Sequence, residues 1–232
     1  MKISVVIPHY NQHEYLNKAI GSVLDQTYKP YEIIIVDDCS ITPLSGEYAA
    51  NVIFQRTENG GIGAVRADGL MCATGDYIAF LSADDLWAPT FLEECAKELE
   101  KCEAVYTDYY NIDAAGNIKD HFKEAVLNNR EDFCVQAWLR CNVMFSGLVV
   151  SKRICDMVGY EPSLRFGEDY LFLLKAMKHM DFAHIQKPLA YYRRHDKQTT
   201  ITKQLEIFEN DKKIRRMALD YWDKFPNRFL EE

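Results

Sequence analysis

Two pairs of neighbouring acids, Asp37-Asp38 and Asp84-Asp85, each follow a short apolar run of the kind that forms a buried strand. In a doubly wound parallel sheet, ligands bind in the crevice outside the carboxyl ends of the strands. We therefore expect both acid pairs at the edge of the sheet where a ligand binds.

The two pairs suit different parts of a nucleotide ligand. An acid such as Asp38 at a strand end can accept hydrogen bonds from a base N–H or from ribose hydroxyls, although aspartates also favour turns. Adjacent carboxylates such as Asp84 and Asp85 repel each other unless they are solvated or bound to a cation, and their oxygens suit Mg²⁺ or Mn²⁺. The alternative for this second pair is that one aspartate caps the helix that follows.

Two later groups carry further chemistry. Glu168-Asp169 opens a predicted helix, where a carboxylate could act as a general base toward an acceptor hydroxyl or could stabilise the helix dipole. Arg193-Arg194-His195 could supply a metal ligand in His195 and two cations for phosphate, and the alternative is a surface position.

The glycine-rich segment Gly60–Gly63 precedes a predicted helix and could bring backbone N–H groups close to phosphates. It matches neither the dinucleotide-binding fingerprint nor the P-loop pattern. A tight turn is therefore the alternative for these glycines.

Hydrophobic periodicity predicts the elements that must position these groups. Predicted strands cover residues 3–7, 32–36, 51–55, 77–81, 104–108, 143–150 and 189–193. Predicted helices cover residues 64–73, 89–102, 131–140, 151–158, 169–180 and 202–224. A further helix begins after residues 11–14, and its apolar face consists of Leu16, Ala19, Ile20, Val23 and Leu24. Four strand–loop–helix units in the first ninety or so residues indicate an α/β fold with a parallel, doubly wound sheet.

The composition limits the class of protein. The chain has 232 residues and a formal net charge of −8, which argues against non-specific binding to nucleic acid but still allows a nucleotide ligand with a cation. Its seven cysteines have no CxxC spacing, and no run reaches the ~18–20 apolar residues of a membrane span. We expect reduced thiols and a cytoplasmic protein, with peripheral contact at the inner face of the membrane left open.

Taken in order, six segments resemble family 2 glycosyltransferases with the GT-A fold. They are SVVIPHYN, VDDCS, NGGIGAVRADG, GDYIAFLSADD, GED and YYRRH, and they span residues 3–195. The resemblance implies a Rossmann-like, mostly parallel central sheet with flanking helices and a C-terminal helical extension. It also implies a nucleotide-binding half at about 1–110, an acceptor-binding half at about 111–200, and an extension at 201–232.

The resemblance carries site roles onto matching positions of this sequence. Donor binding falls on Pro8, Tyr10, Asp38, Gly63, Arg66, Ser82, Ala83 and Asp84. A divalent cation, Mn²⁺ or Mg²⁺, falls on Asp84 with Asp85 and His195, and the catalytic base falls on Asp169. Acceptor binding falls on Phe145, Ser146, Gly147 and Glu168.

The sequence departs from the family pattern at two positions. Ser82 stands where the DxD motif has its first acid, and Ala67 stands where an Asn often follows Arg66. The first change weakens an expected ribose contact. Because Asp85 directly follows Asp84, it stays open which of the two carboxylates binds the cation. The QxxRW signature of processive synthases is absent, which favours addition of a single sugar.

We therefore predict an inverting glycosyltransferase that moves one sugar from a nucleotide-diphosphate sugar, with UDP as the default, to a glycan or lipid-linked glycan. The alternatives are a catalytically idle nucleotide-sugar-binding protein and a sugar-phosphate nucleotidyltransferase. The terminal helix has apolar positions at Leu205, Phe208, Ile214, Met217 and Trp222. Beside the lysines and arginines of this helix, Ile214, Met217 and Trp222 could dock on a membrane, and the alternative is packing on the same domain or against a second subunit.

Overall fold

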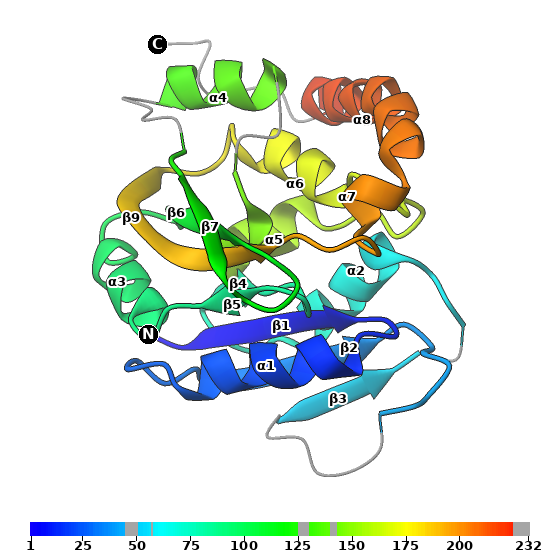
Figure 1. Cartoon of the computed structure of the whole chain (residues 1–232). Helices are drawn as coiled ribbons and strands as arrows, with labels where there is room; N and C mark the ends of the chain where they lie inside the picture. The colour runs from blue at the N-terminus through cyan, green and yellow to red at the C-terminus, as the bar shows by residue number, and fades with distance from the viewer. Residues whose placement is uncertain (45–50, 57, 125–129, 140–142, 225–232) are drawn as a thin grey trace.

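The computed structural model describes residues 1–44, 51–56, 58–124, 130–139 and 143–224 (Figure 1). The strands are β1 (Ile3–His9), β2 (Glu32–Asp37), β3 (Val52–Gln55), β4 (Tyr77–Phe80), β5 (Leu86–Trp87), β6 (Ala104–Ile112), β7 (Ile118–Phe122), β8 (Leu148–Ser151) and β9 (Phe182–Arg193). The helices are α1 (His13–Leu24), α2 (Ile62–Cys72), α3 (Phe91–Glu98), α4 (Arg130–Leu139), α5 (Lys152–Val158), α6 (Glu168–Ala176), α7 (Thr199–Thr202) and α8 (Gln204–Lys224).

One sheet runs through the molecule in the order β3-β2-β1-β4-β8-β6-β9-β5, and β7 pairs with β6. The first four strands in this order are parallel to one another, β4 is antiparallel to β8, and every residue of β1 and β2 is buried. Helices on both faces of the sheet remove these strands from water, which is why their sequences are nearly continuous apolar runs. The predicted α/β class, with flanking helices and a C-terminal helix, is confirmed (Figure 1).

The second half of the sheet differs from the prediction. The segment predicted as a strand over 143–150 instead contains a 3₁₀ turn at Phe145–Gly147, and β8 begins only at Leu148. The strand predicted at 189–193 begins seven residues earlier, at Phe182. Strand β7 was not predicted, because all of its residues are exposed and it has no alternating apolar face.

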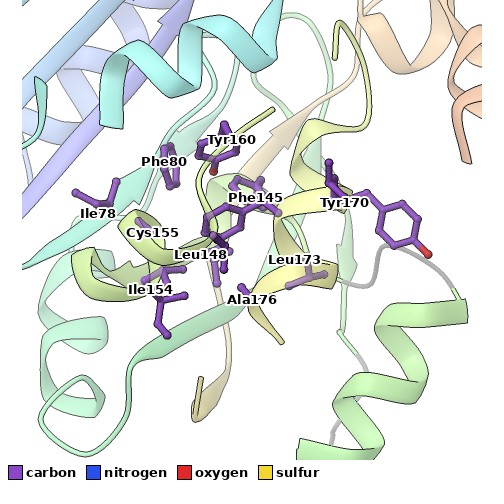
Figure 2. Packing of buried hydrophobic residues seen from close by; sticks show 14 of the residues in the cluster. Ile78, Phe80, Phe145, Leu148, Ile154, Cys155, Tyr160, Tyr170, Leu173 and Ala176 are labelled. Atoms are coloured by element: carbon purple, nitrogen blue, oxygen red, sulfur yellow. The ribbon is translucent and has the colours of Figure 1, made fainter. Parts of the chain in front are cut away.

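Two clusters of buried residues pack against the sheet. One contains residues of α1 and α3, and the other contains residues of α2, α5, α6 and α8. Figure 2 shows the centre of the second cluster, where Phe80 of β4 lies beside Phe145 and Tyr160, with Ile154 from α5 and Leu173 from α6 nearby. The ring centres of Phe80 and Phe145 are 5.6 Å apart, so this aromatic group forms a rigid support under the end of β4.

The predicted apolar face of α1 is buried except at its end. Leu16, Ala19, Ile20 and Val23 are buried, whereas Leu24 is 42% exposed. Leu24 is the last residue of the helix and lies about 100° around the axis from Val23, which turns it away from the sheet. Including Leu24 in the packed face was wrong.

The C-terminal helix α8 packs on α6 through part of its predicted apolar set. Ile214 is buried and Met217 and Trp222 pack against the core, whereas Leu205 and Phe208 are 70% and 75% exposed. Ile214, Met217 and Trp222 therefore pack on the same domain, which was the alternative to docking on a membrane. No described helix is both long and apolar enough to cross a membrane.

Candidate active site

Three predicted donor-binding positions come together at one edge of the sheet. Tyr10 follows β1, Asp38 follows β2 and Ser82 follows β4. These strands are neighbours and run parallel, so their carboxyl ends lie side by side. Tyr10 is 47% exposed, whereas Pro8, one position inside β1, is buried. Tyr10 is thus free to present its ring to a ligand.

Asp38 holds the glycine turn that follows β3. Its two carboxylate oxygens accept hydrogen bonds from the N–H groups of Gly60 and Gly61, each at 2.8 Å, and Arg56 Nε lies 3.2 Å from Oδ1. Gly61 has a φ of +83°, a conformation that favours glycine. In this arrangement Asp38 fixes the turn, and a nucleoside contact would use the remaining acceptor capacity of its oxygens.

Helix α2 carries Gly63 and Arg66 to the segment that precedes α6. A Cβ on Gly63 would lie 2.4 Å from the carbonyl oxygen of Leu164, so only glycine allows this approach. Arg66 is 4% exposed and forms an ion pair with Glu168, and its guanidinium carbon lies 4.6 Å from the centre of the Phe145 ring. Arg66 is therefore a buried cation beneath the start of α6.

The acids Glu168 and Asp169 have different surroundings. Glu168 is 4% exposed and paired with Arg66. Burial raises the pKa of Glu168 to about 7, the charge of Asp169 adds to the effect, and Arg66 opposes it. The Asp169 side chain is 36% exposed and lies 3.9 Å from Arg66 Nη1. Asp169 is therefore the acid of this pair that can reach a ligand.

The start of α6 also depends on the terminal helix. Gly167 precedes α6 with a φ of +78°, and a Cβ there would lie 2.3 Å from Cδ1 of Ile214 in α8. This contact fixes the entry of the chain into Glu168 and Asp169. Residues beyond 200 therefore contribute to the shape of the site.

Asp84 and His195 meet at the end of β4, although they are 111 residues apart. His195 Nε2 lies 3.1 Å from Asp84 Oδ2, and the two side chains are 6% and 13% exposed. An oxygen donor and a nitrogen donor at this spacing fit a divalent cation such as Mn²⁺. Among the described residues, no group of three or more His, Cys, Asp or Glu side chains could hold a metal ion. Phosphate oxygens and water would have to complete the coordination.

Asp85 is bonded to protein groups other than His195. Its carboxylate accepts hydrogen bonds from Ser146 Oγ at 2.5 Å and from the backbone N–H of Arg193 at 3.0 Å. The residue is 2% exposed, and burial raises the pKa of Asp85 well above its ordinary range, with a further contribution from the charge of Asp84. Both oxygens of Asp85 already accept hydrogen bonds from the protein, so the shared cation site stays a prediction for this residue.

The stretch predicted to contact the acceptor is buried. Phe145 belongs to the aromatic group in Figure 2, and the Ser146 hydroxyl donates to Asp85 and accepts from the backbone N–H of Ser82 at 3.1 Å. Gly147 is also buried, and a Cβ there would lie 3.2 Å from Thr107 Oγ1. These three residues are buried behind the end of β4, and the side chains of Phe145 and Ser146 contact other protein groups and are not exposed to an acceptor. Ser82 and Ala83 likewise connect the end of β4 to this support.

Arg193 does not face the solvent as a phosphate-binding residue would. It is 1% exposed and donates to main-chain carbonyls of Asp84, Asp113 and Ala114. Arg194 is exposed and stacks over the Tyr192 ring at 4.8 Å. The buried position of Arg193 opposes its predicted phosphate contact, and tertiary contacts of a late strand leave no local pattern that could have shown this. Arg194 is exposed, and its phosphate contact stays a prediction.

A second polar cluster was missed. Asp108 on β6 is buried, and its two oxygens lie 2.8 Å and 3.3 Å from the Nε2 atoms of His184 and His121. The backbone N–H of Glu124 also donates to Asp108. His121 lies on β7 and His184 on the early part of β9, both outside the predicted strands, so no sequence signal brought these residues together.

Comparison with known proteins identifies the family. Residues 4–158 match the family model "Glycosyl transferase family 2". An uncharacterized glycosyltransferase of Rickettsia typhi is 30% identical over 219 residues, covering 89% of this chain and 69% of the relative. Succinoglycan biosynthesis protein ExoW of Rhizobium meliloti is 28% identical over 202 residues, covering 74% of this chain and 62% of ExoW.

Solved structures share the fold. S. aureus TarS 1–349, crystallised in complex with UDP-GlcNAc, has a TM-score of 0.73 and 20% sequence identity, covering 95% of this chain. This chain spans 66% of that TarS chain. The structural likeness confirms the predicted GT-A-type fold, and the family model matches well over half of the sequence. The chain therefore belongs to glycosyl transferase family 2.

Proposed function

We propose that this glycosyltransferase moves one sugar from a uridine-diphosphate sugar to a hydroxyl group of a glycan or lipid-linked glycan, with inversion at the anomeric carbon. The observation that carries the proposal is the approach of Asp84 and His195 to 3.1 Å at the edge of the sheet that also holds Tyr10 and Asp38. Two relatives support it, because TarS was crystallised with UDP-GlcNAc and ExoW is named for succinoglycan biosynthesis.

On the donor side, Tyr10 and Asp38 would hold the nucleoside and Ser82 would make a weak hydroxyl contact with the ribose. Gly63 and Arg66 lie on the helix that the family places under the donor. Asp84 and His195 would hold Mn²⁺ or Mg²⁺, which when bound neutralises negative charge on a departing diphosphate. The proposed donor-binding residues all lie before about residue 110, in the half of the chain that we propose binds the nucleotide.

On the acceptor side, Asp169 would accept the proton of the acceptor hydroxyl. As the proton transfers, the hydroxyl oxygen forms a bond to the anomeric carbon on the face opposite UDP, and the bond from that carbon to the diphosphate oxygen breaks. The electron pair of that bond leaves with UDP, so the configuration inverts. The 36% exposure of Asp169 supports this role, and the buried Arg66–Glu168 pair would fix the start of α6 beside the acceptor.

The proposed activity also suggests the acceptor and the compartment. The acceptor would be a growing glycan, either free or lipid-linked, and the reaction would take place in the cytoplasm or at the inner face of the membrane. The cysteines of the described residues are all free, which supports a reducing compartment.

The test combines binding with turnover. A thermal-shift screen of nucleotides with and without Mn²⁺ should show UDP or a UDP-sugar as the strongest stabiliser, because a ligand that binds only the native state raises its stability. Donor consumption should then depend on an acceptor and on Mn²⁺ or Mg²⁺. Nucleotide-sugar binding without turnover would indicate an idle binding protein. Formation of UDP-sugar from UTP and a sugar phosphate would indicate a nucleotidyltransferase.

A further inference from the structure

The burial of the charged Arg193 guanidinium requires a physical explanation. This side chain is 1% exposed, and its guanidinium donates to the main-chain carbonyls of Asp84, Asp113 and Ala114. The charge of Arg193 acts on the nearby Asp85, but no direct ion pair with a carboxylate is among its contacts in the described residues. Burying a charge without a direct ion pair is costly, and an apolar side chain of similar volume would often serve stability as well or better. A buried arginine that is bonded only to carbonyls is therefore a poor stabilising device, and its contacts indicate what else it does.

The contacts of Arg193 converge on the acids at the end of β4. Its Nε donates to the carbonyl oxygen of Asp84 at 2.7 Å, and its backbone N–H donates to Asp85 Oδ1 at 3.0 Å. Two residues later, His195 Nε2 reaches Asp84 Oδ2 at 3.1 Å. One short segment of β9 and its continuation thus holds the main chain of Asp84, the side chain of Asp84 and the side chain of Asp85.

The other end of the guanidinium is anchored elsewhere. Its Nη1 donates to the carbonyl oxygens of Asp113 and Ala114, both at 3.1 Å, in the turn between β6 and β7. Its central carbon lies 4.9 Å from the centre of the Tyr15 ring on α1. Gln198 Nε2 donates to the carbonyl oxygen of Arg193 at 2.7 Å. The guanidinium is therefore held on several sides and transmits that position to the peptide of Asp84.

We propose that Arg193 is a positioning residue that sets the Asp84 peptide, and through it the Asp84 carboxylate, for binding of the donor diphosphate and its cation. The inference rests on the proposed function, since Asp84 has this task only if the chain binds a nucleotide sugar with a divalent cation. A planar guanidinium suits the role, because its donors point in fixed directions to Asp84 on one side and to residues 113–114 on the other. A lysine ammonium keeps the charge but cannot reach the carbonyl of Asp84 and the carbonyls of residues 113–114 at the same time.

The test uses the full chain with Arg193→Lys as the variant. Arg215→Lys is the control, because Arg215 also donates to a main-chain carbonyl, that of Trp138, is partly buried, and lies on α8 outside the site. Mn²⁺ affinity is measured on protein saturated with UDP, from the free Mn²⁺ signal in electron paramagnetic resonance. UDP affinity without metal is measured by calorimetry. Hydrogen–deuterium exchange of the peptide covering residues 82–88 reports directly on the strand end.

Arg193→Lys should weaken Mn²⁺ binding about tenfold or more, as loss of an outer-shell partner typically does. The UDP affinity without metal should stay within about twofold of wild type, and deuterium uptake in residues 82–88 should rise. The loss of kcat should be larger at low Mn²⁺ than at saturating Mn²⁺. Arg215→Lys should change none of these beyond about twofold. A merely structural role would lower the unfolding temperature of both variants without this selective loss of metal affinity.

A folded Arg193→Lys variant with native Mn²⁺ affinity and native exchange at residues 82–88 would overturn the proposal. If that variant does not fold, Gln198→Ala takes its place, since it removes only the bond to the Arg193 carbonyl, and native behaviour there counts equally against the proposal. If the wild-type chain binds neither UDP nor Mn²⁺, the proposed function fails. In that case unchanged exchange at residues 82–88 in the variant would still refute the positioning role.

Discussion

The two acid pairs of the site, Asp84-Asp85 and Glu168-Asp169, have similar surroundings, but the buried acid is the second of the first pair and the first of the second pair. In each pair one acid is buried and the other is accessible. Asp85 is held by the backbone N–H of Arg193, and Glu168 is held by the Arg66 guanidinium. The accessible acid comes first at the end of β4 and second at the start of α6.

The comparison shows how an adjacent pair of like charges is tolerated at a binding edge. Two neighbouring carboxylates repel each other, and the repulsion falls if one of them takes up a proton. Burial raises the pKa of Asp85 well above its ordinary range and that of Glu168 to about 7, so the proton favours the buried member in both pairs. The accessible members, Asp84 and Asp169, are left for chemistry on the donor and the acceptor.

The largest effect should come from the accessible acid of α6. Asp169→Asn removes the proposed base, and a general base typically contributes 10²–10⁴-fold, so kcat should fall by roughly that factor. The unfolding temperature should change little, because the side chain is partly exposed. Steady-state transfer kinetics measure the loss. Near-normal turnover in a folded variant would mean that Asp169 is not the base.

The accessible acid of the first pair should affect donor binding more than proton transfer. Asp84→Asn should weaken Mn²⁺-dependent UDP binding on the order of 100-fold, because a charged metal ligand becomes neutral. Asp85→Asn is the contrasting variant, and it should act through protein stability. Calorimetry with and without Mn²⁺ distinguishes them. Equal losses of metal affinity in both variants would show that the two carboxylates share the cation after all.

The buried acid of α6 should give the protein a pH-dependent stability. Because the folded pKa of Glu168 is raised from its ordinary 4.5 to about 7, the stabilising contribution of its protonated form is complete below about pH 4.5 and is lost as the pH rises through about 7. Glu168→Gln should remove this loss. The variant should therefore gain about 3 kcal/mol relative to wild type between pH 4.5 and pH 8 in urea unfolding. Parallel pH profiles for the two proteins would contradict the assignment.

The smallest effect should come from the hydroxyl that supports Asp85. Ser146→Ala removes its hydrogen bond to the Asp85 carboxylate and should cost about 1 kcal/mol in the free energy of unfolding. Transfer at saturating acceptor should stay within about twofold of wild type, because Ser146 is buried beneath the site. A raised KM for the acceptor with unchanged stability would instead favour the acceptor contact expected from the sequence.

The common edge of the site could be predicted from the sequence. The runs that form β1, β2 and β4 are largely apolar because most of their residues are buried, and polar residues follow each run. That pattern predicted the parallel sheet and the acids Asp38 and Asp84 at its edge, whereas Tyr10 and Ser82 were assigned to donor binding by the family resemblance. The order of the family-like segments predicted the fold class.

The surroundings of each acid could not be predicted in the same way. The partner of Asp85 lies 108 residues away and the partner of Glu168 lies 102 residues away, so no local pattern says which acid of a pair is covered. The early part of β9 and all of β7 lack a continuous apolar run, because much of their surface is exposed. The cluster of Asp108 with two histidines was invisible for the same reason.

The division between the two acid pairs is tested most directly by one titration. Mn²⁺ is titrated into UDP-saturated wild type, Asp84→Asn and Asp169→Asn, each with its folding verified by circular dichroism. Asp84→Asn should bind Mn²⁺ on the order of 100-fold more weakly, while Asp169→Asn should bind within about twofold of wild type despite its lost turnover. Native Mn²⁺ affinity in Asp84→Asn, or an equal loss in Asp169→Asn, would contradict the separate donor and acceptor roles of the two pairs.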